Sequence, residues 1–176
     1  MTKNILISGS SKGLGRMLAT ILRDKGFKVF TMGRTPSTEV DLIVDLTDEK
    51  TTSELLITFL SKNDIDILIC NAGTGKAPSE VTSNNDLRDY FYSKNFLTAK
   101  NLINACIPFL KPKSLVIAIS SIVALKDIEG APREYAYAKQ ELNKMFRNLA
   151  VEQASKEIRF NIISPGNVYF STSRWE

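Results

Sequence analysis

Short apolar runs alternate with longer amphipathic segments along this chain of 176 residues. Runs with almost no polar interruption are typical of strands that are buried on both faces of a parallel sheet. The segments between them repeat apolar residues at helical spacing. We expect strands at 4–7, 28–32, 42–44, 65–70, 114–119 and 158–163. We expect helices at 14–25, 48–62, 85–110 and 134–153, the third of which ends near Pro108.

Strands that alternate with helices predict an α/β fold, because right-handed crossovers place the helices on both faces of one sheet. The predicted architecture is a doubly wound parallel sheet of about six strands, the Rossmann fold, in a three-layer αβα arrangement. The sequence contains no linker, internal repeat or low-complexity segment. We therefore expect one dinucleotide-binding domain over residues 1–176.

The composition narrows the chemistry that the chain can carry. Histidine is absent, which excludes mechanisms based on Ser-His, Cys-His or His-metal sets, and we predict no metal site. Cys70 and Cys106 lie in apolar runs without CxxC spacing and are expected to be buried thiols. The net charge of +4 is dispersed, so we expect no nucleic-acid partner. Lys3 and Asn4 interrupt the N-terminal apolar stretch, and no run is long enough for a membrane span, so we expect a cytoplasmic protein without a membrane partner.

A glycine-rich turn joins the first strand to the first helix. Gly9, Gly13 and Gly15 follow one another with the spacing GxxxGxG. A helix N-terminus offers unpaired N–H groups and a partial positive charge, and glycines let the backbone approach a phosphate closely. The turn therefore predicts a dinucleotide diphosphate site. A tight turn without any ligand is the alternative interpretation.

The end of the second strand indicates which dinucleotide is bound. An acidic residue at this place accepts the ribose 2′-hydroxyl of NAD(H), whereas a basic residue suits the 2′-phosphate of NADP(H). Here Arg34 follows the strand, and Lys12 in the glycine turn is a second cation. A guanidinium group binds phosphate well. We therefore favour NADP(H) over NAD(H), with the alternative that Arg34 is only a surface residue.

A tyrosine and a lysine four residues apart offer acid–base chemistry without histidine. Tyr135 and Lys139 share one face of the predicted helix 134–153. A free phenol is a poor proton donor or acceptor near neutral pH, and a nearby ammonium group lowers its pKa by favouring the phenolate. The pair is a candidate general acid–base device, although this spacing also occurs by chance in many helices.

Taken together, the motifs resemble those of the short-chain dehydrogenase/reductase family in its single-domain form. They occur in the family's order from end to end of the chain, and they are Gly9-xxx-Gly13-x-Gly15, Asn71-Ala72-Gly73, Ser120-Ser121, Tyr135-xxx-Lys139 and Pro165-Gly166.

The resemblance implies a role for each matching position. Tyr135 would be the general acid for carbonyl reduction or the base for alcohol oxidation, and Lys139 would lower its pKa and hold the nicotinamide ribose. Ser121 would stabilise the developing oxyanion, and Asn95 would support the lysine. The implied catalytic set is Ser121, Tyr135, Lys139 and Asn95. The implied cofactor-binding residues are Gly9, Ser11, Lys12, Gly13, Leu14, Gly15, Arg34, Asp45, Leu46, Asn71, Ala72, Gly73, Tyr135, Lys139, Pro165, Gly166 and Val168.

Several of these positions also have a structural interpretation. Asn71 could cap the end of its strand, Asn95 could be an ordinary exposed helix residue, and Asp45 could cap the helix that follows it. Ser120 could take the place of Ser121 as the active hydroxyl.

The sequence departs from the family at its C-terminal end. Phe170 stands where the family often has a threonine, for which Ser171 or Thr172 could substitute. Family members usually continue through a substrate-covering helix pair and a seventh strand, whereas this chain stops at Glu176, so its C-terminal segment is expected to be short.

The predicted function is an NADP(H)-dependent oxidoreductase that reduces a carbonyl or oxidises an alcohol of a small molecule. The rival prediction is a catalytically weak or inactive NADP(H)-binding module or sensor subunit that a partner completes. The resemblance also implies a homodimer formed through the helices 85–110 and 134–153.

Overall fold

Six parallel strands form the centre of the computed structural model, which describes residues 2–169. Their order across the sheet is β3-β2-β1-β4-β5-β6. The strands are β1 Asn4–Ser8, β2 Lys28–Gly33, β3 Leu42–Ile43, β4 Ile67–Cys70, β5 Leu115–Ile119 and β6 Arg159–Ile163. This topology confirms the predicted doubly wound α/β fold.

The strand order reverses beside β1. The chain runs outward from β1 to β2 and β3, then returns to place β4 on the other side of β1. In open sheets of this kind, ligands bind in the crevice that opens at the carboxyl ends of the strands at such a reversal. The loops that follow β1, β2, β3 and β4 therefore define the place to search for a site.

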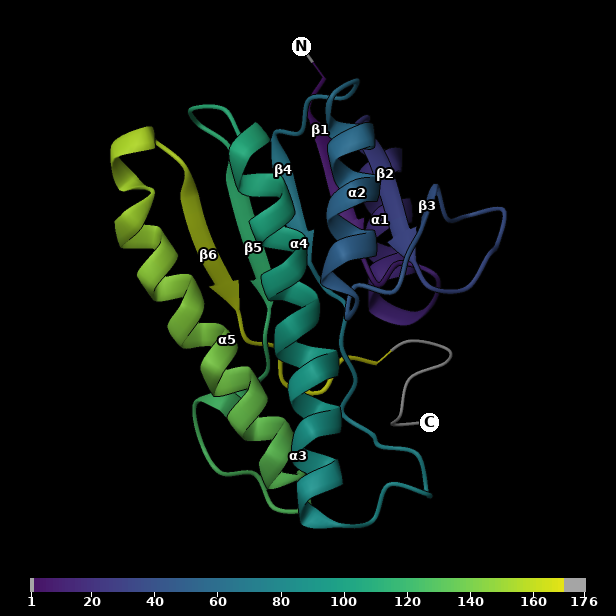
Figure 1. Cartoon of the computed structure of the whole chain (residues 1–176), viewed down its shortest axis with the longest axis vertical. Helices are drawn as coiled ribbons and strands as arrows, with labels where there is room; N and C mark the ends of the chain where they lie inside the picture. The colour runs from purple at the N-terminus through teal and green to yellow at the C-terminus, as the bar shows by residue number, and fades with distance from the viewer. Residues whose placement is uncertain (1, 170–176) are drawn as a thin grey trace.

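Helices cover the two faces of the sheet unequally. Figure 1 shows α2, α4 and α5 in front of the sheet, with α1 behind β1 and β2. The larger core lies under the front helices and includes Leu68, Leu102 and Val116, which are fully buried. The main helices are α1 Gly13–Asp24, α2 Glu49–Leu60, α3 Asn84–Tyr92, α4 Thr98–Cys106 and α5 Arg133–Glu152.

The long helix expected at 85–110 is interrupted in its middle. A π-helical turn, Ser93–Leu97, separates α3 from α4, and a 3-10 turn, Ile107–Phe109, follows α4. Apolar periodicity runs through the whole segment, so the sequence pattern did not reveal the interruption. The fully buried Asn95 lies inside the π-helical turn.

The edge strand β6 has one buried face and one open face. Phe160 is buried on the side of α5, whereas Arg159 and Asn161 are exposed on the other side and Ile163 is half exposed. Within residues 2–169, no strand pairs with the outer edge of β6. The predicted role of Ser171 or Thr172 in place of Phe170 lies outside the described residues. A search of the described helices finds none with the length and apolarity needed to cross a membrane.

Candidate active site

The glycine turn after β1 brings backbone atoms unusually close together. Gly9 and Gly13 have positive φ angles of 67° and 58°. A Cβ atom at Gly15 would overlap the carbonyl oxygen of Gly9 and the amide of Asn71, so only glycine fits where α1 meets the turn. Within residues 2–169, no side chain caps the N-terminus of α1 and its first turn holds no acidic residue. The turn could therefore hold a diphosphate on the free N–H groups of α1.

Asn71 ties the end of β4 to this turn. Its Nδ2 donates to the carbonyl oxygens of Ser8 at 3.1 Å and Gly9 at 3.0 Å. In return, the Ser8 hydroxyl accepts from the backbone N–H groups of Asn71 and Ala72, both at 3.1 Å. Asn71 thus has the strand-end role that we considered for it, and it also lines the pocket described next.

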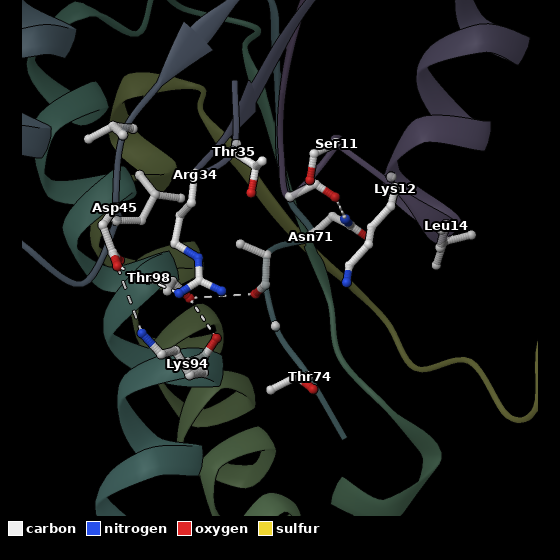
Figure 2. A pocket seen from close by; sticks show the side chains of 18 of the residues that line it. Ser11, Lys12, Leu14, Arg34, Thr35, Asp45, Asn71, Thr74, Lys94 and Thr98 are labelled. Atoms are coloured by element: carbon white, nitrogen blue, oxygen red, sulfur yellow. Dashed lines mark hydrogen bonds and ion pairs between the residues drawn. The ribbon is translucent and has the colours of Figure 1, made fainter. Parts of the chain in front are cut away.

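A pocket of about 710 Å³ opens at the carboxyl ends of β1 to β4. This volume lies within the range of about 300 to 1,000 Å³ that small-molecule and cofactor sites occupy. Figure 2 shows Arg34 and Lys94 extending toward one side of the pocket, with Lys12 reaching in from across it. The predicted cofactor-binding residues in its lining are Gly9, Ser11, Lys12, Gly13, Leu14, Gly15, Arg34, Asp45, Leu46, Asn71, Ala72 and Gly73.

The lining also contains residues that the sequence analysis did not single out, namely Gly33, Thr35, Val44, Thr74, Tyr90, Lys94 and Thr98. The first four lie at the carboxyl ends of strands or in the loops that follow them, where the fold places ligand-binding residues. Tyr90, Lys94 and Thr98 are spaced four residues apart along the segment 84–106. This spacing puts them on one helix face and was the signal that could have found them.

Asp45 forms a local turn and does not cap α2. Its Oδ1 accepts hydrogen bonds from the backbone N–H of Thr47 at 3.0 Å and from the Thr47 hydroxyl at 2.7 Å. The cap of α2 is Asp48, whose Oδ1 accepts from the N–H of Thr51 at 3.0 Å. The capping alternative for Asp45 is therefore wrong, and its second carboxylate oxygen faces the cations of the pocket.

Asn95 joins the π-helical turn to the loop after β4. Its Oδ1 accepts from the N–H of Thr74 at 3.0 Å, and its Nδ2 donates to the carbonyl oxygens of Thr74 and Phe91, both at 3.0 Å. The side chain is fully buried, so the alternative of an exposed helix residue is wrong. The π-helical turn leaves the Phe91 carbonyl facing this amide, and the side chain satisfies it.

Lys139 lies beneath the same loop. Its Nζ donates to the carbonyl oxygen of Ile119 at 2.9 Å and lies 6.0 Å from the centre of the Tyr135 ring. A Cβ atom at Gly73 would stand 2.6 Å from Asn95 Oδ1 and 3.4 Å from Lys139 Nζ, so the two side chains meet under Gly73. Burial lowers the pKa of Lys139 to about 8.

Tyr135 and Ser121 flank this cluster on separate segments. Tyr135 is half-buried at the start of α5, and its ring lies 5.8 Å from that of Phe91. Ser121 is half-buried at the N-terminus of the 3-10 turn Ile122–Ala124, against which α5 packs. Ser120 is 5% exposed, and its hydroxyl has no partner among the described residues, so Ser121 is the more accessible of the two hydroxyls.

The segment after β6 closes on the segment after β5. The carbonyl oxygen of Pro165 accepts from the N–H of Ile122 at 2.9 Å, one residue beyond Ser121. Gly166 is exposed and Val168 is half-buried. These residues, like Tyr135 and Lys139, lie outside the lining of the glycine-turn pocket. The structure thus groups the predicted residues into a glycine-turn pocket and a neighbouring Asn95–Lys139 cluster, which Gly73 joins.

The chain is similar in sequence to known short chain dehydrogenases and reductases. The family model for short chain dehydrogenases matches residues 3–175. The chain is 27% identical to a 3-ketodihydrosphingosine reductase of Bacteroides thetaiotaomicron, with 97% of this chain and 66% of the relative covered. It is 28% identical to a benzil reductase of Saccharomyces cerevisiae, with 96% and 72% covered. It thus spans about two thirds to three quarters of the length of these curated relatives.

Solved structures of similar proteins have the same fold. An NADH-dependent reductase in complex with NAD superposes with a TM-score of 0.83 at 26% identity, covering 95% of this chain and 79% of the other. A short-chain dehydrogenase from Streptomyces avermitilis superposes with a TM-score of 0.83 at 23% identity, covering 98% and 69%.

Proposed function

Because this chain belongs to the short-chain dehydrogenase family, we propose that it is an NADP(H)-dependent oxidoreductase that reduces a carbonyl or oxidises an alcohol of a small molecule. One observation carries the proposal. The Asn95–Lys139 cluster lies under Gly73, and Gly73 itself lines the glycine-turn pocket. The proposed acid–base groups therefore lie directly beside the glycine-turn pocket, separated from it only by Gly73.

The proposed chemistry divides among four side chains. NADPH, when bound, supplies a hydride to the carbonyl carbon of the substrate. Tyr135 donates its phenolic proton to the carbonyl oxygen, and the positive charge of Lys139 makes this proton easier to release. The Ser121 hydroxyl donates a hydrogen bond to the same oxygen as negative charge develops there. Asn95 is a positioning residue that holds the loop carrying Gly73 above the Lys139 ammonium group.

Two cations support NADP(H) over NAD(H). Arg34 follows β2 and Lys12 lies in the glycine turn, and both line the pocket. Within residues 2–169, no acidic side chain directly follows β2, where one would accept a ribose 2′-hydroxyl. The similar reductase solved in complex with NAD is NADH-dependent and gives no support for NADP(H). The preference proposed for this chain therefore rests on its own residues.

The decisive experiment follows NADPH absorbance while the protein is incubated with ketones, oxoacyl thioesters and keto-sugars. We expect turnover of at least one class. Tyr135→Phe should lower that turnover by a factor of about 10² or more, the usual contribution of one acid–base group. NADPH binding, measured by calorimetry, should stay within threefold of the wild-type value. Tyr137→Phe is the matched control, because Tyr137 is half exposed and its hydroxyl accepts from Arg133 on the surface.

Two results would contradict the proposal. Full activity in Tyr135→Phe would remove the tyrosine from the mechanism. NADPH binding without turnover of any substrate would instead support the rival function, a binding module or sensor subunit without catalysis.

We also propose that two copies pair through the helical segments 85–110 and 134–153. Exposed apolar side chains on these segments support a contact, with Tyr92 39% and Val151 79% exposed. Light scattering should give twice the chain mass of 19.6 kDa. Val151→Lys should shift the protein toward the monomer. A wild-type mass equal to that of one chain would refute the dimer.

A further inference from the structure

A second cation lies beside Arg34 at the same side of the pocket. Arg34 Nη1 is 3.7 Å and Lys94 Nζ is 3.9 Å from one carboxylate oxygen, Oδ2 of Asp45. The Lys94 side chain is 23% exposed, whereas the Arg34 side chain is 63% exposed. Figure 2 shows these three side chains converging from different segments. The more enclosed cation is therefore Lys94, which neither the glycine motif nor the Tyr-Lys pair includes.

The carboxylate of Asp45 is fixed and charged. Two hydrogen bonds from Thr47 hold its Oδ1, which leaves Oδ2 for the cations. Burial opposes its ionisation, but the Thr47 hydrogen bonds and the charges of Lys94 and Arg34 outweigh this effect and lower the pKa of Asp45. A fixed negative charge therefore lies within a few ångströms of the guanidinium group proposed to bind the 2′-phosphate.

This arrangement creates a conflict that a further cation can resolve. A phosphate bound to Arg34 would come close to the Asp45 carboxylate, and two like charges in a partly enclosed site repel each other. Arg34 would also have to serve two anions at once. With Lys94 beside the same oxygen, Asp45 keeps a counter-charge when Arg34 turns to a phosphate.

Lys94 lies in the π-helical turn, on the side of the segment that faces the pocket. Asn95, its neighbour in the turn, uses its amide on Thr74 and Phe91, whereas Lys94 faces the pocket. Lys94 belongs to the row Tyr90, Lys94 and Thr98 on the pocket side of the segment. Lys94 thus faces the glycine-turn pocket, whereas the adjacent Asn95 belongs to the Asn95–Lys139 cluster.

We propose that Lys94 determines the preference for a 2′-phosphorylated dinucleotide by neutralising Asp45, which leaves Arg34 available for the phosphate. This inference rests on the proposed NADP(H) dependence. It assigns Lys94 an indirect role as a specificity-determining residue, because it acts on the phosphate through Asp45. The ligand class concerned is a nucleotide with a phosphomonoester on the adenosine ribose.

The test measures dissociation constants for NADPH and NADH by calorimetry in four proteins: wild type, Lys94→Met, Asp45→Asn and the double variant. Methionine keeps the apolar stem of Lys94 and removes its charge. We expect Lys94→Met to weaken NADPH binding on the order of tenfold and NADH binding less than threefold. In the Asp45→Asn background, the same substitution should leave the ratio of the two constants unchanged, since no carboxylate remains to be neutralised.

Two further variants sharpen the result. Lys94→Arg keeps the positive charge and should retain the wild-type ratio within about threefold. Lys62→Met removes a lysine that is exposed beyond the end of α2 and should leave both constants unchanged.

Each adverse outcome has its own meaning. If Lys94→Met weakens both dinucleotides equally or neither, Lys94 does not determine the preference. If Lys94→Met still changes the ratio of the NADPH and NADH dissociation constants in the Asp45→Asn background, Lys94 contacts the phosphate directly and the indirect role is wrong. If the wild-type protein prefers NADH or binds no dinucleotide, the proposed cofactor and this inference fail together.

Discussion

The ammonium nitrogen of Lys139 lies 2.9 Å from the carbonyl oxygen of Ile119, the last residue of β5. Lys139 is 3% exposed, so the end of a central strand holds a cation inside the protein. Burial penalises the charged form and lowers the pKa of Lys139 to about 8, compared with 10.5 for a free lysine.

This lowered pKa makes stability depend on pH in a defined window. Between about pH 8 and 10.5 the unfolded chain binds the Lys139 proton more tightly than the folded chain does. The free energy of unfolding should therefore rise with pH across this window, by about 3 kcal/mol from this residue. Below pH 8 both states are protonated, and the burial penalty is present in full. Urea denaturation of wild type and Lys139→Met from pH 7 to 10.5 measures the difference.

Cys70 needs to be removed from both proteins in this comparison. Burial raises the pKa of the Cys70 thiol, and the charge of Lys139 interacts with it, so the thiol also contributes to pH dependence. With Cys70→Ala in both backgrounds, the protein that keeps Lys139 should gain stability relative to Lys139→Met as the pH rises through this window. Parallel curves would mean that Lys139 is not buried with a lowered pKa.

Asn95 is expected to matter for stability as well as for position. Asn95→Ala would leave the N–H of Thr74 and the carbonyl oxygens of Thr74 and Phe91 without their partner. Unsatisfied buried polar groups should lower the free energy of unfolding by about 2 to 4 kcal/mol. Asn104→Ala, at an exposed position on α4, is the control and should change it little. A loss of similar size in both variants would contradict the role assigned to the Asn95 amide.

A side chain at Gly15 should destabilise the fold. Gly15→Ala places a methyl group against the Gly9 carbonyl oxygen and the Asn71 amide, both of which belong to packed elements. We expect the free energy of unfolding to fall by about 1 to 3 kcal/mol from overpacking, as measured in urea. A Cβ at Gly166 would meet no atom within 4 Å among the described residues, so the stability of Gly166→Ala provides the comparison. Equal stability of the two variants would show that the turn can relax around the methyl group.

The sequence pattern predicted the elements well because short apolar strands alternate with longer amphipathic helices. The strand at 4–7 and the helix at 134–153 differ from β1 and α5 by single residues at their ends. The π-helical turn at Ser93–Leu97 escaped prediction. It is stabilised by the Asn95 amide, which contacts a loop 21 residues away in the sequence, and local periodicity does not carry such tertiary contacts.

The candidate site was predictable where it follows strands and less so where it lies on a helix. The glycine turn and Asn71 follow from the rule that ligands bind at the carboxyl ends of parallel strands. To predict that Lys94 lines the pocket, one would have to know how the segment 84–106 is rotated against the sheet, and this rotation depends on packing. Its charge was visible in the sequence, but its pairing with Asp45, far away in the sequence, was not.

Because one face of β6 is open, we expect this strand to be the first part of the sheet to loosen. Its exposed Arg159 and Asn161 give water access to that flank, and its outer backbone groups have no strand neighbour within residues 2–169. Local opening starts where few apolar contacts must be broken, so β6 can detach transiently while β1 and β4 stay paired. The glycine-turn pocket would thus stay formed during such fluctuations, whereas the hydrogen bond between Pro165 and Ile122, beside Ser121, would break and re-form with them.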